Sequence, residues 1–328
     1  MKKVISILVM AILALVTVNA QQISVVSPEG ETTIYRTLPD AIEGAADGSV
    51  VYLPGGGFPI SDDVKITKKL TIIGIGHKSW SGNVDGVTTI AGNLFFNEGS
   101  SGSAVMACYI TGSVNIGDRG ASVNDVLIRY CNLHSIQVNN SSCSETAVNQ
   151  NYIRSISEFG GSNPIITNNV LYTIGGVSGG KITHNIVLNN YYLHVIAVSN
   201  SVISYNVFFH CIGGASNNGF CNGGGNQGTD NMYPNAHNGY AQFDNRIILN
   251  EGVSWDDVFV KNAGISPVSD FHFTEEYKQY ENQVGIYGGS GFNDNQMAPV
   301  PYIIYKDIPE QTDSEGKLKI QIRVKANQ

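Results

Sequence analysis

The sequence predicts an all-β solenoid whose coils are about 20 residues long. Three observations predict it. A short pattern with Asn or Cys at one position recurs through the middle of the chain, Gly makes up 37 of 328 residues while only 14% are charged, and the long Ala/Leu/Glu/Lys segments typical of helical bundles are absent. The hydrophobic fraction of 42% excludes global disorder. A β-sandwich is the alternative, but a sandwich does not need one residue type at one phase of a repeat.

The chain begins with a pattern typical of an export signal, and we predict a signal peptide over residues 1–20. Lys2 and Lys3 precede an apolar run over residues 4–18, and Ala20 follows at a position that signal peptidase accepts. A membrane span needs about 20 apolar residues, so a single-span anchor is the less favoured alternative. We expect an exported protein, in the periplasm, at the cell surface or secreted, with no membrane span after cleavage. The net charge of −8 argues against a nucleic-acid partner.

The repeat has the form apolar-x-x-Cys/Asn-x-apolar. Asn tolerates left-handed backbone geometry at a bend, and stacked Asn side chains can bond one another between coils. The pattern therefore predicts a ladder at one corner of the solenoid, with the flanking Ile, Val and Leu side chains pointing inward. A degenerate copy surrounds Asn245, after an insertion. The predicted rungs are Cys108, Cys131, Asn151, Asn169, Asn185 and Asn206.

The five cysteines form no CxxC pair, which disfavours a zinc site, and their odd number leaves at least one unpaired within the chain. Cys108 and Cys131 would lie one coil apart, near enough for a thiol stack or a disulfide. We favour the stack. The others are Cys143, Cys211 and Cys221.

Residues 35–42, 47–57 and 64–76 resemble the beginning of the pectate-lyase-like right-handed parallel β-helix superfamily, and the resemblance covers most of the mature chain. It implies a right-handed parallel β-helix over residues 21–298, with a short N-terminal helix that caps the open end. Residues 255–260 and 271–273 are similar to the late coils of exported bacterial members, and residues 284–289 to the segment that closes the helix.

A C-terminal tail is predicted over residues 299–328. Prolines interrupt its first part, a turn signal follows at residues 312–316, and residues 317–325 alternate between charged and apolar. The alternation predicts a strand with a basic face. This strand could pack along the solenoid, the favoured interpretation, or pair with the sheet edge of a protein partner.

The catalytic branches of this superfamily use acidic calcium ligands with an Arg or Lys base, or a cluster of Asp residues. In residues 100–250 the carboxylates are few, and we expect none to repeat at one phase in neighbouring coils. The paired-Asp and Gly-His-Gly motifs of polygalacturonases are also absent. We therefore predict a member without the usual catalytic motifs, with no metal site and no cofactor, although calcium stays possible.

The Gly- and Asn-rich insertion over residues 212–242 is the place where function is expected, because long loops often carry it. The catalytic candidates there are Asp230, His237, Asp244 and Arg246, which could supply an acid, a base and a neutralising charge. The candidates for substrate binding are Tyr191, Tyr192, His194, His210 and Tyr240. Each of these side chains has a simpler interpretation as a solvated or turn-forming residue.

Three functions remain open. The leading hypothesis is a secreted or surface protein that binds a polysaccharide or cell-surface glycan without turning it over. The second is a polysaccharide lyase or glycoside hydrolase that acts through residues 212–246. The third is a structural or adhesion module that docks to another protein through residues 317–325.

Overall fold

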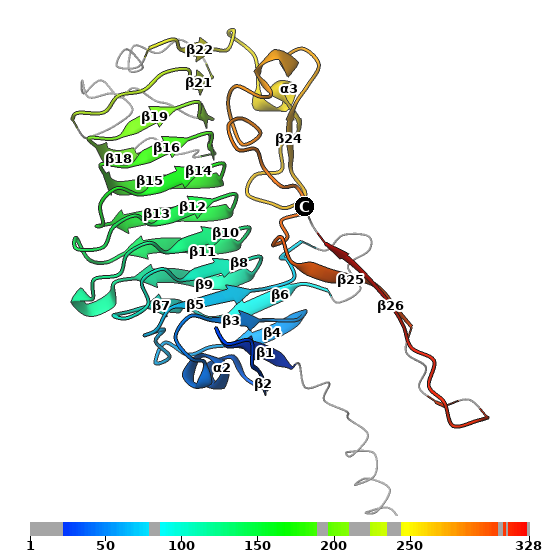
Figure 1. The fold of residues 1–328 in the computed structure, drawn as a ribbon. Helices are drawn as coiled ribbons and strands as arrows, with labels where there is room; N and C mark the ends of the chain where they lie inside the picture. The colour runs from blue at the N-terminus through cyan, green and yellow to red at the C-terminus, as the bar shows by residue number, and fades with distance from the viewer. Residues whose placement is uncertain are drawn as a thin grey trace, which may run out of the picture.

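The computed structural model describes residues 22–78, 86–188, 196–209, 224–234, 244–307, 311–312 and 314–326. These residues form a parallel β-solenoid of about seven turns, with two helices, a flanking segment and a C-terminal hairpin (Figure 1). The predicted all-β parallel β-helix is therefore confirmed. The predicted signal peptide lies outside the described residues. No helix among the described residues is long and apolar enough to cross a membrane.

The solenoid is built from two sheets. The first sheet contains β1 Ile23–Val26, β2 Thr32–Tyr35, β3 Ser49–Tyr52, β5 Leu70–Ile73, β8 Ala104–Met106, β10 Leu127–Arg129, β12 Ala147–Asn149, β14 Ile165–Thr167, β16 Lys181–Thr183 and β19 Val202–Ser204. The second contains β4 Gly56–Pro59, β6 Thr88–Ala91, β7 Leu94–Phe96, β9 Tyr109–Ile116, β11 Asn132–Val138, β13 Tyr152–Phe159, β15 Val170–Ser178, β17 Ile186–Val187, β18 Ile196–Ser199, β20 Val207–Phe208, β21 Met232–Tyr233 and β22 Ile247–Ile248. From β3 to β19 and from β4 to β22 the neighbouring strands are parallel, as successive coils require.

The core is a column of apolar side chains inside the coils. Each short strand of the first sheet points its middle residue inward, and the strand register aligns these residues from coil to coil. All are fully buried: Val105, Ile128, Val148, Ile166, Ile182 and Ile203. Because each coil covers the apolar interior of its neighbour, the solenoid is stabilised coil by coil.

The predicted ladder is present, and it has one rung more than expected. The side-chain Nδ2 of each Asn donates to Oδ1 of the next at 3.0 Å, from Asn151 to Asn231. Asn231, rather than Asn245, follows Asn206, because the register of β21 with β22 places Asn231 opposite Arg246. All the rungs are fully buried.

The left-handed geometry that we expected at the rungs lies one residue earlier. This residue has a φ near +55° in each coil from β8 to β22, and Asn245 belongs to this row. We call it the αL row, and its members are Ala107, Tyr130, Gln150, Asn168, His184, Tyr205, Asp230 and Asn245. The sharp bend turns the αL side chain outward while the following rung side chain points inward.

The thiols at the first two rungs are not joined, which confirms the favoured stack. Cys108 and Cys131 are free, as is the buried Cys143. The thiols of Cys108 and Cys131 donate to the carbonyls of Met106 and Arg129, each at 3.3 Å. Burial raises the pKa of Cys131 to about 12 and that of Cys108 well above its ordinary value, so both stay protonated. Cys211 and Cys221 lie outside the described residues.

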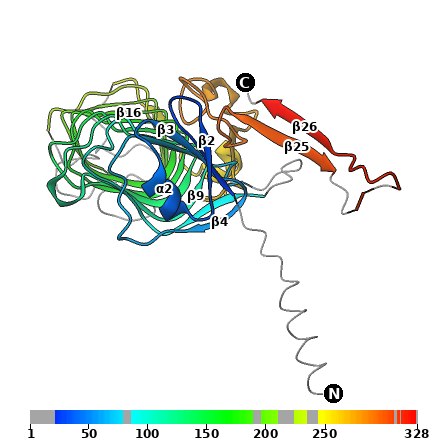
Figure 2. The same cartoon turned by 60° about the horizontal axis from the view of Figure 1, so that its bottom comes forward.

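The N-terminal end of the solenoid is closed by α2 Leu38–Gly44, as predicted (Figure 2). The hydroxyl of Thr37 accepts from the backbone N–H of Asp40 at 3.2 Å, and Pro39 lies in the first turn, where its missing N–H is tolerated. The buried face of the helix carries Leu38, Ala41 and Ile42, which join the solenoid core. The cap thus covers apolar surface that the first coil would otherwise expose.

The segments predicted as late coils form a module beside the solenoid instead. It contains α3 Trp255–Val258, the antiparallel strands β23 Phe259–Lys261 and β24 Asp270–Phe273, and the 3-10 turn η3 Lys278–Tyr280. The indole of Trp255 stacks on Phe209 at 4.4 Å between centroids and donates to the Phe209 carbonyl at 2.9 Å. A second apolar core thus joins the module to outward-facing residues of the second sheet.

Residues 284–298, which we call the strap, run back along the αL row toward the N-terminal coils. Gly285 N donates to the carbonyl of Tyr205 at 2.8 Å, and the amide of Asn168 donates to the carbonyls of Ile286 and Gly288, each at 2.8 Å. Asn293 N donates to Gln150 at 2.6 Å. The strap therefore covers this corner of the solenoid instead of closing its end.

The C-terminal tail forms a hairpin of β25 Pro301–Asp307 and β26 Gln321–Ala326. The predicted strand is thus present. The favoured packing along the solenoid is wrong, because the hairpin projects away from the body and Leu318, Ile320, Ile322 and Val324 remain 44–59% exposed (Figures 1 and 2).

Candidate functional site

A groove on the outer face of the second sheet is the strongest candidate site. Its floor is a row of three side chains from successive coils: His134 on β11, Arg154 on β13 and Tyr172 on β15. The register aligns them, and neighbouring strands lie about 4.8 Å apart, so one extended ligand could contact all three. Each row residue lies three positions after a ladder rung, where the backbone of the strand directs it outward.

Residues from two parts of the chain form the walls of the groove. Tyr109 and Asn132 lie on β9 and β11, and Ile265 belongs to the flanking module. Gly264 lies against the hydroxyl of Tyr172, where an added Cβ would come within 3.3 Å. The groove encloses about 380 Å³. This volume is in the range of small-ligand sites.

The groove is locally basic in a chain with a net charge of −8. Arg154 and His134 are exposed, and neither makes a hydrogen bond or ion pair with another residue that the structure describes. No carboxylate is among the residues that line it. The free guanidinium can bind a carboxylate or sugar hydroxyls, and the rings of Tyr109 and Tyr172 offer apolar faces with a polar tip.

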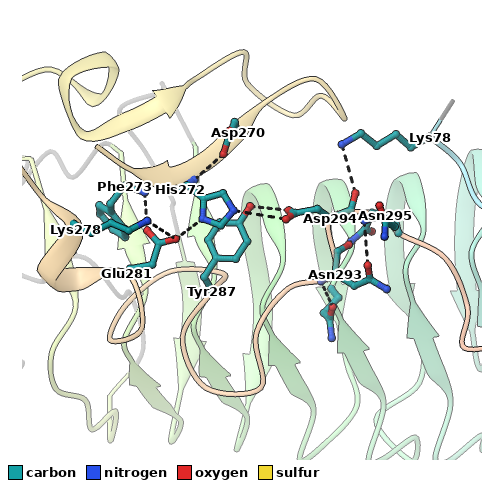
Figure 3. Close-up of polar contacts among 12 residues, drawn as sticks. Lys78, Asp270, His272, Phe273, Lys278, Glu281, Tyr287, Asn293, Asp294 and Asn295 are labelled. Atoms are coloured by element: carbon teal, nitrogen blue, oxygen red, sulfur yellow. Dashed lines mark hydrogen bonds and ion pairs between the residues drawn. The ribbon is translucent and has the colours of Figure 1, made fainter. Parts of the chain in front are cut away.

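A second cluster of charged side chains lies where the flanking module meets the strap (Figure 3). His272 is bonded through Nδ1 to Glu281, and its Nε2 lies 3.6 Å from Oδ2 of Asp294. The imidazole stacks on Tyr287 at 3.8 Å between centroids, and the Tyr287 hydroxyl donates to Asp294 at 2.7 Å. The imidazole is therefore held on both edges and one face.

The charges in this cluster stabilise the contact between the flanking module and the strap. Burial opposes the charge on Glu281, but the hydrogen bonds from His272 and from Phe273 N outweigh it and lower the pKa of this carboxyl. Burial, followed by the charge of Asp294, raises the pKa of Tyr287. Lys278 adds an ion pair to Glu281 at 3.5 Å. The cluster ties η3 and β24 to the strap.

Three of the predicted catalytic residues are described, and they lie at the C-terminal end of the solenoid. Asp230 N donates to the carbonyl of Asp244 at 3.1 Å, and the Asp230 carboxylate accepts from the Thr229 hydroxyl at 2.7 Å. Arg246 is exposed and directly precedes β22. The other candidates lie outside the described residues: His237, Tyr191, Tyr192, His194, His210 and Tyr240.

The expectation that no carboxylates share a phase in neighbouring coils is wrong for one pair. Asp125 and Glu145 follow the paired residues Asn124 and Ser144 and have φ values of 57° and 58°. Both are exposed at a second corner. No group of three His, Cys, Asp or Glu side chains suited to a metal ion occurs among the described residues. Calcium stays a prediction.

Sequence reasoning missed the groove, although a signal for it was present. The positions three residues after the rungs read His134, Arg154 and Tyr172 in three consecutive coils, which the ladder phase alone would have identified. The wall at Ile265 had no such signal, because it comes from a distant segment.

No protein-family model, no curated protein and no solved structure matches this chain. The fold alone therefore defines its class, a parallel β-solenoid of about seven turns.

Proposed function

We propose that this chain is an exported β-solenoid of the pectate-lyase-like kind that binds carbohydrate in the groove without turning it over. The observation that carries the proposal is the row of His134, Arg154 and Tyr172 on a rigid sheet, with a guanidinium that has no partner among the described residues. Export is supported by residues 1–20, and N-terminal sequencing of the exported protein, expected to begin at Gln21, tests it.

The shape of the groove supports a saccharide ligand. A row of side chains at the spacing of parallel strands matches a chain molecule lying across the coils, and Tyr109 and Tyr172 supply ring faces against which the apolar faces of sugars pack. The rigid strands hold these groups in place before binding, which reduces the entropy that binding must overcome. A neutral chain could use the hydroxyl contacts, whereas an acidic one would also pair with Arg154.

Calorimetric titration of the mature protein with neutral and acidic oligosaccharides tests the proposal, with and without calcium. We expect Arg154→Ala to weaken binding at least tenfold, about 1.4 kcal/mol. Arg36→Ala is the matched control, because it removes another exposed arginine, which lies just before the capping helix and belongs to no candidate site. If nothing binds, or if both variants behave alike, the groove is not the site.

The same mixtures distinguish binding from turnover. We expect no unsaturated products in ultraviolet absorbance and no new reducing ends. Products that vanish in Asp230→Ala or Arg246→Ala would favour the alternative, a lyase or hydrolase that acts through residues 212–246.

A further inference from the structure

The row of side chains on the floor of the groove continues beyond the groove in both directions. The strand register extends it toward the N-terminus through Thr111 and Ala91, and toward the C-terminus through Leu188 and Phe209. Thr111 and Ala91 are exposed, as are the groove residues that follow them. Leu188 and Phe209 are only 2% and 5% exposed. The row is therefore open over the N-terminal coils and covered over the C-terminal coils.

The flanking module and the strap cover the C-terminal part of this face. Leu188 and Phe209 belong to the second apolar core, where Phe209 stacks on Trp255 of α3. The neighbouring outward row, one residue after the rungs, changes in the same way, because Tyr109 is 40% exposed and Tyr152, two coils later, is 3% exposed. Figure 1 shows α3 and β24 beside the C-terminal coils.

The loop between β23 and β24 marks the boundary between the open and the covered part. Its Ile265 lines the groove together with Tyr172, and both side chains pack against the second apolar core. Its Gly264 lies against the Tyr172 hydroxyl. The loop therefore stands across the row directly after Tyr172 and closes the groove at this end.

A groove that is closed at one end suits the end of a chain molecule better than its middle. An extended chain that lies across the coils can leave over Thr111 and Ala91, where the row is exposed. In the other direction it would meet Ile265 and the module. The distance from His134 to Tyr172 is two strand spacings, roughly 10 Å, so the closed part of the groove is short.

We propose that the groove binds the end of a polysaccharide chain. The terminal sugar lies against Tyr172 and Ile265, and the rest of the chain leaves over His134 and Thr111. Arg154, one strand away from Tyr172, bonds the hydroxyl or carboxylate groups of the terminal sugars. This inference rests on the proposed function, because it names the part of the glycan that the groove accepts.

The number of protein molecules bound to each glycan chain tests the inference. The mature protein is titrated calorimetrically with a galacturonate hexasaccharide and with maltohexaose, each compared with a much longer chain of the same sugar. We expect one protein molecule per chain at both lengths, because each chain has one end of the kind that binds. A groove that accepts internal sugars would bind several protein molecules on the longer chain.

The same titrations separate this inference from the proposed function. If Arg154→Ala weakens hexasaccharide binding but several protein molecules bind each long chain, the inference is overturned and the proposed function stands. If no probe binds in a way that depends on Arg154, both are overturned.

A bulky side chain at the closed end provides a second test. Ile265→Trp fills the space beside Tyr172, and we expect it to weaken binding of the hexasaccharide and of the long chain alike, at least tenfold. The matched control is Val268→Trp, because Val268 belongs to the same loop, is 60% exposed and lies outside the groove lining. Unchanged binding in Ile265→Trp, or an equal loss in Val268→Trp, contradicts the placement of the terminal sugar.

Discussion

Each asparagine of the ladder bonds buried backbone groups of its own coil and of the neighbouring coils. The Nδ2 of Asn169 donates to the carbonyls of Val148 and Thr167, each at 2.9 Å, and to Oδ1 of Asn185 at 3.0 Å. Its own Oδ1 accepts from the backbone N–H of Asn151 at 2.9 Å. The buried amide therefore supplies hydrogen bonds at the tight bend of each coil, where buried polar groups need partners.

Replacing Asn169 by Leu should therefore destabilise the protein strongly. The variant leaves several buried donors and acceptors unpaired, and we expect a loss of about 3 kcal/mol in the free energy of unfolding. Urea denaturation measures it. The control is Asn149→Ala, which removes an outward amide bonded to Thr167 and should cost under about 1 kcal/mol. Equal losses would show that the ladder contributes no more than a surface bond.

At the scale of elements, two glycines of the strap allow it to lie close to the αL row. The ring of His184 stacks on Tyr205 at 5.0 Å between centroids, and Gly288 and Gly289 lie directly against it. An added Cβ at Gly289 would come within 2.9 Å of the ring, and its φ of +63° also favours glycine. The glycines therefore allow the strap to approach a row of outward side chains.

Gly289→Ala should release the strap without unfolding the coils. We expect faster hydrogen exchange in residues 284–298, while the ladder amides remain protected. Gly291→Ala is the control, because Gly291 has a similar φ of +76° but no atom lies within 4 Å of the position that its Cβ would take. Faster exchange of the strap in both variants would assign the effect to backbone strain alone.

At the scale of the whole molecule, a few side chains connect the first coils to the end of the chain. His77 bonds to Gln296 at 3.3 Å and packs edge-on against Tyr152. Burial lowers the pKa of His77 to about 4, so the folded protein holds this imidazole neutral. Glu281 is held charged by His272 at the other end of the strap. Protonation at low pH therefore disfavours both the neutral, buried His77 and the charged Glu281.

The folded protein should therefore lose stability as the pH falls below 6.5. The pKa of His77 is about 4 in the folded protein and 6.5 in the unfolded chain. The free energy of unfolding is therefore unaffected by His77 above pH 6.5 and decreases as the pH falls toward 4, because the unfolded chain then binds a proton that the folded protein does not. The loss by pH 4 is about 3 kcal/mol. Glu281 adds a further loss at lower pH. Urea titrations across this range measure it, and His77→Gln should remove the His77 component; an unchanged profile would contradict the assignment.

The parts of this protein that its sequence predicts are those that repeat. The rungs and the inward apolar residues contact their equivalents one coil away, so each contact leaves a periodic trace, and the N-terminal cap carries the local signals of a helix start. The outward row of His134, Arg154 and Tyr172 has the same periodicity and was within reach of the same reasoning.

The sequence by itself thus determined the β-solenoid, its ladder, its capping helix and the terminal strand. Only the tertiary structure decided that residues 255–298 lie beside the coils, that the strap covers the αL row, that Ile265 forms a wall of the groove and that the hairpin projects from the body. These arrangements depend on single contacts between residues far apart in the chain, such as His77 with Gln296, 219 positions away. A contact that occurs only once does not recur along the sequence, so no repeating pattern predicts it.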